Sequence, residues 1–195
     1  MSQRITFSTV HIPDIESVLA EKERLSKHNQ HRRLLVSLTS SLVVLTALVT
    51  LSISLFFPVL QVTGISMQPS LSEGSIVLGW KPESYERGDI CFFYHQNKLL
   101  LKRVIGLPGD IIDIAQDGTV SVNGEALTET YVNQKSFGDC NISFPFQVPD
   151  DSYFVLGDNR LQSVDSRNSA IGCVSSNQME GKVIFKIWPF GPISS

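Results

Sequence analysis

The longest feature of the hydrophobic pattern extends from Leu34 to Phe57 and contains no charged side chain. As a helix, this run extends about 36 Å, enough to cross a bilayer core of about 30 Å. A cleavable signal peptide is the alternative, but its apolar region has only about 7 to 15 residues behind a short basic leader. Here the leader is long, since it comprises all of 1–33. The pattern therefore predicts a transmembrane signal anchor over 34–57 that stays in the protein.

Upstream of this run, a charged segment carries apolar residues with partial helical spacing. They are Ile15, Val18, Leu19 and Leu25. This spacing favours a short amphipathic helix at the surface.

Downstream of the run, short apolar stretches alternate with turn signals, and no long 3.6-residue period follows residue 60. The stretches lie at 75–80, 89–95, 99–107, 111–115, 119–122, 153–157 and 182–188. Their length and their aliphatic and aromatic content predict strands. The pairs Asp117-Gly118 and Asn123-Gly124 suit tight hairpin turns, and residues 95–98 are expected to form another. We therefore expect one mostly β domain over 58–195.

The charges on the two sides of the apolar run differ in sign. Residues 22–33 hold five Lys and Arg against one Glu, whereas residues 58–195 hold 10 Lys and Arg against 15 Asp and Glu. Because basic residues stay on the cytoplasmic side, residues 1–33 are expected in the cytoplasm and residues 58–195 outside the cell membrane. The acidic domain also lacks the basic patch of a nucleic-acid-binding protein.

The cysteines and histidines do not have metal-ligand spacing. The four histidines are scattered, and the three cysteines contain no CxxC pair. We therefore expect neither a metal nor another cofactor. Cys91 lies in the apolar stretch ICFFY and is expected to fill the core. Cys140 and Cys173 can pair or remain free, since spacing does not decide between the two.

Candidate chemistry begins at Ser66 and Lys102. A serine in a turn is most often only solvated, but Lys102 lies in the apolar stretch LLLKRVIGL, where a charge is costly. One interpretation is a lysine whose amine reaches solvent at a strand edge. The other is a buried lysine that loses its proton and acts as a general base on a serine hydroxyl. Arg103 faces the opposite side of the strand and cannot lose its proton, so only Lys102 suits this role.

The stretch GDNRLQSVDSR, residues 157–167, is the third candidate. A polar loop is the simplest interpretation. Its two acids and two arginines also suit an ion-paired brace, formed by Asp158, Arg160, Asp165 and Arg167. Ser163 can then orient the amine of Lys102.

Five stretches together resemble the bacterial type I signal peptidases, which are membrane serine proteases with a Ser/Lys dyad. They are GISMQPSL, RGDI, LLKRVIGLPGD, GDNRLQSVDSR and GKVIFKIWPF, in the order of the family and behind a membrane anchor. The resemblance implies strongly bent antiparallel β-sheets. It also implies that Ser66 is the nucleophile, Lys102 the general base and Ser163 the hydrogen-bond partner of the amine. The four charged residues of the 157–167 stretch correspond to the ion-paired shell that supports the site.

The same resemblance implies that the substrates are exported preproteins, cleaved after small residues at −3 and −1, within reach of the lipid bilayer. In an extended peptide these two residues face the same side, which suits two shallow pockets. We place Val62, Met67 and Leu101 at those pockets. Many members of the family have a serine at the position of Gly64, so here the oxyanion hole is expected from backbone N–H groups at Ser66 and Gly64.

The sequence leaves two alternatives open. One is a related membrane peptidase specialised for pilin or conjugation precursors. The other is a catalytically silent, membrane-anchored binding protein, although Ser66, Lys102 and Ser163 are all present. Self-cleaving Ser/Lys repressors are disfavoured, because they have a DNA-binding N-terminal domain and no membrane span.

Overall fold

The computed structural model describes residues 14–193. The chain divides into two compact units, Met1–Ser52 and Ile53–Ser195. The predicted cytoplasmic segment over 1–33 lies partly outside the described residues, because 1–13 are not described.

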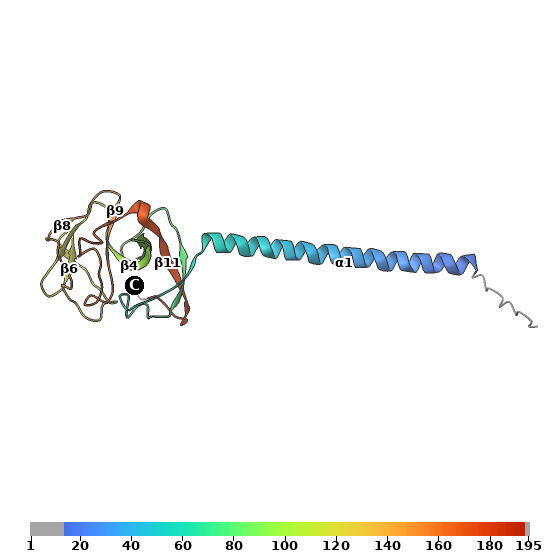
Figure 1. Cartoon of the computed structure of the whole chain (residues 1–195), viewed down its shortest axis with the longest axis horizontal. Coiled ribbons are helices and arrows are strands. Elements are labelled where there is room, and N and C mark those ends of the chain that lie inside the picture. Colours follow the sequence, from blue (N-terminus) through green and yellow to red (C-terminus); the bar gives the residue numbers. More distant parts are fainter. Residues whose placement is uncertain (1–13, 194–195) are drawn as a thin grey trace, which may run out of the picture. The chain divides into compact units, whose positions relative to one another are not determined.

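One long helix, α1, extends over Ile15–Phe56 (Figure 1). Its stretch Arg32–Ile53 is long and apolar enough to cross a membrane. The expectation of a separate short helix at the N-terminus was wrong, since α1 is continuous from Ile15 onward. No Gly or Pro lies between Ile15 and Phe56 to interrupt it, and Pro58 follows its end.

Hydroxyl groups inside the apolar part of α1 are satisfied within the helix itself. Thr46 Oγ1 donates to the Leu42 carbonyl at 2.8 Å, and Ser52 Oγ donates to the Leu48 carbonyl at 2.9 Å. Thr39, Ser40 and Thr50 make similar bonds to carbonyls three or four residues earlier. Because these hydroxyls need no outside partner, their side chains are compatible with a lipid environment.

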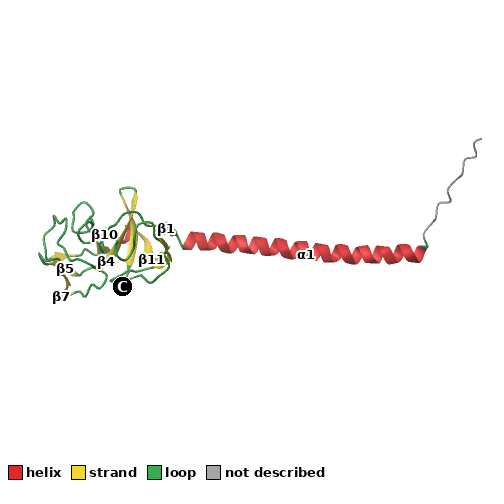
Figure 2. Ribbon diagram, turned by 90° about the horizontal axis from the view of Figure 1, so that it is seen from below, coloured by secondary structure: helices red, strands yellow, loops and turns green. Residues whose placement is uncertain are grey.

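The β unit contains two antiparallel sheets (Figure 2). The seven-stranded sheet has the order β1 (Val59–Gln61), β2 (Ile76–Trp80), β11 (Met179–Trp188), β3 (Ile90–His95), β4 (Lys98–Gly106), β9 (Ser152–Leu156) and β10 (Val174–Ser175). The four-stranded sheet has the order β7 (Glu125–Ala126), β6 (Val120–Val122), β5 (Ile111–Ile114) and β8 (Phe146–Gln147). A 3-10 helix over Ser176–Gln178 precedes β11. Within this unit β6 and β8 lie at one end and β11 at the other, with β4 and β9 between them (Figure 1).

The predicted fold class is confirmed, and each of the seven predicted strands is present with similar bounds. The predicted turn over 95–98 joins β3 to β4, with Gln96 and Asn97 at φ 45° and 63°. The Asn123-Gly124 turn joins β6 to β7, with both residues at positive φ. Both are the left-handed two-residue turns that match the twist of a hairpin.

Three hydrophobic clusters form the core of the β unit. One cluster contains Met67, Leu71 and Phe92 and lies under the turn that carries Ser66. A second packs the small sheet against β4 and β9, through residues such as Ile112 and Phe154. The third includes Cys91, which is fully buried and fills the core as expected.

Cys140 and Cys173, whose pairing the sequence left open, are both free thiols in this structure.

The two sides of β4 are paired over different lengths. On one side β3 pairs with β4 from Lys98 to Arg103, whereas on the other side β9 pairs only from Arg103 onward. The first half of β4 therefore has a free edge toward the loop that follows β1. Since β1 is the last strand of the sheet, its outer edge is free as well among the described residues.

Candidate active site

The structure brings Ser66 and Lys102 together: the Lys102 Nζ atom lies 2.9 Å from the Ser66 Oγ atom. Ser66 is half-buried in a turn that follows β1, and the next residue, Met67, is 1% exposed. The Leu71 N–H donates to the Met67 carbonyl at 2.9 Å and closes the turn. Because Met67 and Leu71 are anchored in the core, the hydroxyl of Ser66 is held at a defined place.

Lys102 lies in the middle of β4, with Cys91 as its cross-strand neighbour, and the residue is 3% exposed. Among the described residues it forms no ion pair. Burial lowers the pKa of its amine below 10.5, and the nearby Asp165 carboxylate offsets part of that decrease. A neutral amine at hydrogen-bond distance from a hydroxyl can accept its proton.

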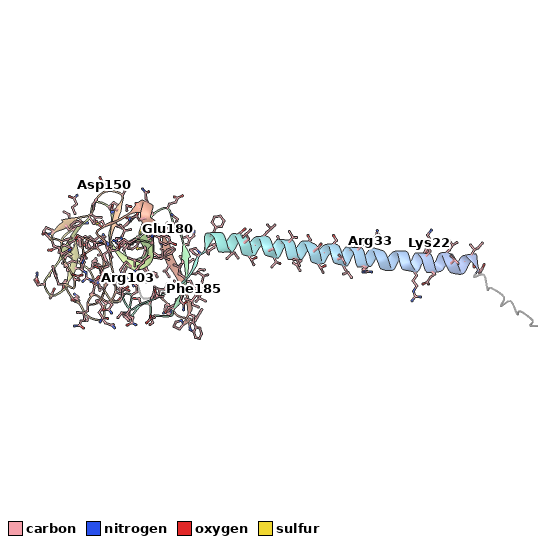
Figure 3. The ribbon with its side chains drawn as sticks, in the orientation of Figure 1. Lys22, Arg33, Arg103, Asp150, Glu180 and Phe185 are labelled. Atoms are coloured by element: carbon pink, nitrogen blue, oxygen red, sulfur yellow. The ribbon has the colours of Figure 1, made fainter. Side chains whose placement is uncertain are left out.

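Arg103 follows Lys102 in β4 and therefore points to the opposite face of the strand. It is 1% exposed and is labelled within the β unit in Figure 3. Its guanidinium binds both oxygens of Asp158, at 2.8 and 2.7 Å, and donates to the Gly88 carbonyl at 2.8 Å. It also stacks on the Tyr131 ring, with 3.8 Å between the Cζ atom and the ring centroid. Such bidentate and stacked contacts compensate the burial of its charge.

The four charged residues of the 157–167 stretch do not pair only with one another. Asp165 binds Arg167 through two contacts of 2.8 Å, as expected of a brace. Asp158 instead pairs with Arg103, and Arg160 pairs with Glu129, at 2.6 and 3.0 Å. All four residues of the expected brace are ion-paired, but Asp158 and Arg160 pair with residues outside the stretch.

The physical reason is that a bidentate carboxylate lies in the plane of the guanidinium, along its N–H bonds, and here residues outside the stretch provide that arrangement for Asp158 and Arg160. Glu129 and Arg103 supply that geometry from other parts of the chain, and Tyr131 donates its hydroxyl to Glu129 at 3.1 Å. Nothing in the local sequence around Glu129 identified it. The two-residue period of a strand indicated that Arg103 points away from Lys102, but it did not indicate a partner for the guanidinium.

The stretch also contributes two contacts to the Ser66 turn that the sequence reasoning missed. The backbone N–H of Asn159 donates to the Ser66 carbonyl at 3.0 Å, and the Asn159 Nδ2 donates to the Ile65 carbonyl at 3.2 Å. Gly157 lies so close that a Cβ atom there would come within 2.6 Å of the Ser66 carbonyl oxygen and would clash with the Ser163 Oγ. In the sequence, the glycine followed by an Asp-Asn pair was the feature that could have indicated these contacts.

Ser163 is buried beside Gly157, and its Oγ has no hydrogen-bond partner among the described residues. The expected bond between Ser163 and the Lys102 amine is therefore absent from this structure, where the amine is bonded to Ser66 instead. A buried hydroxyl without a partner costs free energy, on the order of 1–3 kcal/mol.

Two backbone groups were predicted to bind the oxyanion. The N–H of Ser66 has no acceptor in the described part of the chain and is available. The N–H of Gly64 points to the Glu73 Oε1 atom at 3.4 Å, which is a long contact. Gly64 has φ +83°, a conformation that a serine adopts only with strain.

A cavity of about 480 Å³ borders the dyad. It lies between the free edges of β1 and β4, and Ser66 and Lys102 form part of its wall. Val62, Met67 and Leu101, the residues predicted to form the substrate pockets, all line it. No group of three His, Cys, Asp or Glu within residues 14–193 can hold a metal ion.

The family model described as Signal peptidase, peptidase S26, matches residues 35–188. This chain belongs to the S26 signal peptidase family. Signal peptidase I of Bacillus amyloliquefaciens is 31% identical to it over 185 residues, which cover 89% of this chain and 97% of that protein. Signal peptidase IB of Staphylococcus aureus strain Mu50 is 38% identical over 150 residues, which cover 66% of this chain and 76% of that protein.

A solved structure of a signal peptidase I from Enterococcus faecalis V583 is 30% identical to this chain and has a TM-score of 0.43. The match covers 52% of this chain and 98% of that one. The family and the relatives establish the activity as that of a signal peptidase I, a serine peptidase that acts on preproteins with signal peptides. The apolar helix α1 is the membrane anchor of this signal peptidase.

Proposed function

We propose that this signal peptidase cleaves exported preproteins with Ser66 as the nucleophile and Lys102 as the general base. The observation that carries the proposal is the 2.9 Å distance between the Lys102 Nζ and the Ser66 Oγ in a site where the amine has no ion-pair partner among the described residues. The lowered pKa of Lys102 supports it, because only the neutral amine can accept a proton.

The reaction follows from these two groups. The Ser66 hydroxyl transfers its proton to the Lys102 amine as its oxygen attacks the scissile carbonyl, and the free Ser66 N–H stabilises the developing oxyanion. Collapse of the tetrahedral intermediate breaks the peptide bond, and the Lys102 ammonium returns the proton to the leaving amine. The neutral amine then takes a proton from water, which attacks the acyl ester. The Lys102 ammonium returns this proton to the Ser66 oxygen as the ester bond breaks, and the signal peptide leaves with a new carboxyl end.

Ser163 is proposed to orient the Lys102 amine at a later step of this cycle. Its Oγ is buried without a partner among the described residues, and Lys102 interacts electrostatically with Asp165, two residues further along the chain. Once acylation consumes the Ser66 hydroxyl, the amine needs another hydrogen-bond acceptor, and the buried Ser163 Oγ can supply it.

The substrate is proposed to lie as an extended strand between β1 and β4, whose facing edges are free. Both strands border the cavity at the dyad, since Val59 and Lys98 line it as well as Ser66 and Lys102. The residues before the scissile bond then occupy this cavity. Because side chains two apart share a face, those at −1 and −3 point into the surface formed by Val62, Met67 and Leu101.

The lipid bilayer is the proposed second partner. The basic segment before the apolar part of α1 supports a cytoplasmic N-terminus and a β unit on the outer side of the cell membrane. The segment between Phe57 and Ser66 is short and reaches at most about 30 Å when fully extended. Anchoring both enzyme and precursor in one bilayer raises their effective concentration.

Cleavage of a purified precursor tests the proposed specificity. The detergent-solubilised protein is incubated with a precursor containing Ala-x-Ala, and the cut is identified by mass spectrometry. Replacing Ala at −1 with Leu or Phe should abolish cleavage, whereas the same change at −2 should be tolerated. Equal tolerance at both positions contradicts the two-pocket proposal.

Protease protection tests the proposed topology. Protease added outside intact cells should reach residues 58–195 and leave the N-terminal segment over 1–33 protected. Protection of the β unit under these conditions reverses the assignment.

A further inference from the structure

A second, smaller cavity of about 160 Å³ borders the nucleophile turn. Four amide side chains line it, together with Leu161: Gln68, Asn133, Gln134 and Asn159. None of these residues lines the larger cavity that holds the dyad. The nucleophile turn is therefore bordered by two separate cavities with different linings.

Two residues that line the smaller cavity are close to Ser66. Gln68 follows Ser66 by two residues, and the Asn159 N–H is bonded to the Ser66 carbonyl at 3.0 Å. The larger cavity is lined instead by residues of β1, by the loop that follows it and by the first half of β4. Because both cavities border the nucleophile turn, a peptide that fills the larger cavity up to its −1 residue can continue into the smaller one.

The lining has free hydrogen-bonding groups but no free charge. The two ionic residues at this cavity, Asp158 and Arg160, are buried in pairs with Arg103 and Glu129. The Gln68, Asn133 and Gln134 side-chain amides have no hydrogen-bond partner among the described residues, and neither does the Asn159 Oδ1. Each such amide group offers both a donor and an acceptor.

This chemistry matches a peptide backbone. A peptide bond also presents one donor and one acceptor, so amides can bind it whatever side chain follows. The cavity has room for several water molecules, which an extended backbone can displace. An enzyme that must accept many different mature proteins benefits from binding the backbone after the cut instead of particular side chains.

We propose that Gln68, Asn133, Gln134 and Asn159 form a leaving-group subsite, which binds the backbone of the first residues after the scissile bond. The inference rests on the proposed function, because it takes Ser66 as the residue that marks the cut. Binding there holds the mature segment in place while Lys102 protonates the new amine.

Two substrates with the same residues up to −1 test this subsite. One continues to +4 as a peptide, and the other ends at −1 as a methyl ester and has nothing to place in the subsite. The Asn133→Ala/Gln134→Ala double variant alters two exposed side chains of the subsite, and Gln116→Ala, an exposed amide in a turn of the small sheet, is the matched control. Thermal unfolding verifies that each variant is folded.

The double variant should lower kcat/KM for the extended peptide about tenfold, as expected for losing two hydrogen bonds, while ester hydrolysis and the control variant stay at the wild-type value. An equal loss on both substrates overturns the inference, because the two residues would then act on the dyad. No loss on either substrate overturns it as well. If wild-type protein cleaves neither substrate, the proposed function itself fails, and the inference fails with it.

Discussion

Two neighbouring residues of β4, Lys102 and Arg103, differ in how their buried charge is treated. They are 3% and 1% exposed, on opposite faces of one strand. Arg103 has a bidentate carboxylate, a backbone carbonyl and an aromatic ring around it. Lys102 has one hydrogen bond, to the Ser66 Oγ, and no ion pair among the described residues. The same depth of burial therefore accompanies a fully paired charge on one face and, on the other, an amine whose pKa burial lowers.

The difference supports the proposal that Lys102, and not a histidine, is the general base. Burying a charge without a partner costs several kcal/mol, and a lysine avoids that cost by releasing its proton. An arginine cannot release its proton, so its burial requires partners. Arg103 and its partners keep the 157–167 stretch in place, and that stretch in turn holds Ser66 through Asn159. The predictions below test each half of this comparison.

The largest effect is expected from replacing the base. Lys102→Arg and Lys102→Ala should each lower kcat/KM about 10⁴-fold, because neither residue can accept the Ser66 proton. Steady-state cleavage of an Ala-x-Ala precursor measures the effect, and circular dichroism checks the fold. Lys102→Arg turning over at a near wild-type rate would falsify the assignment of Lys102 as the base.

The second prediction compares the two faces directly through stability. Arg103→Met should lower the free energy of unfolding by about 4 kcal/mol, since it leaves the Asp158 carboxylate buried and unpaired. Lys102→Met should leave stability unchanged or raise it, because it removes an amine that is buried without an ion pair. Urea unfolding of the two variants measures both values. Similar losses in the two variants contradict the comparison.

The third prediction concerns pH. Because the pKa of Lys102 is lowered from 10.5, the folded state binds fewer protons than the unfolded state between the two values. Stability from this residue should therefore rise with pH across that window. The rate should rise too: kcat/KM should increase about tenfold per pH unit below the lowered pKa and then level off.

Lys102→Met provides the control for this pH dependence, since its stability should lack the rise that the wild type shows in the same window. A rate profile with its midpoint at or above 10.5 is the contrary result, because it means that burial does not activate the amine.

The smallest effect is expected on the Arg103 side, at Tyr131. Tyr131→Phe keeps the ring under Arg103 but removes the hydroxyl that donates to Glu129, and it should cost about 1 kcal/mol of stability. Tyr131→Leu also removes the ring and should cost about 2 kcal/mol more. Tyr94→Phe, at an exposed tyrosine, is the matched control. Unfolding free energies that do not differ among the three variants count against the stacked contact.

Much of the fold could be predicted because its signals are local. The apolar run, seven of the strands and the turns at 95–98 and 123–124 each follow from one short, continuous stretch of the chain. The strands that were missed are β1, β7, β8 and β10, which have two or three residues each. A strand that short has no period of its own, and it forms only because a partner strand lies beside it.

The site divides in the same way. Lys102 stood out as a charge in an apolar strand, whereas the role of Ser66 followed from the resemblance to the family. The pairing of Asp158 with Arg103 and of Arg160 with Glu129 had no such signal, since the partners lie 55 and 31 residues apart. Asn159 and Gly157 lie in the stretch that the sequence singled out, but their contacts with Ser66 were missed because those contacts join distant parts of the chain.

Three features could be predicted from the sequence alone: the membrane helix, the β class of the second unit and the opposite orientations of the Lys102 and Arg103 side chains. All three depend on composition or on the two-residue period of a strand, which act over short distances. Three other features became known from the tertiary structure. They are the carboxylate that each arginine binds, the Ser163 hydroxyl without a partner among the described residues, and the cavity lined by the four amides. Those outcomes depend on strand order and register, which place residues far apart in the chain within hydrogen-bond distance of one another.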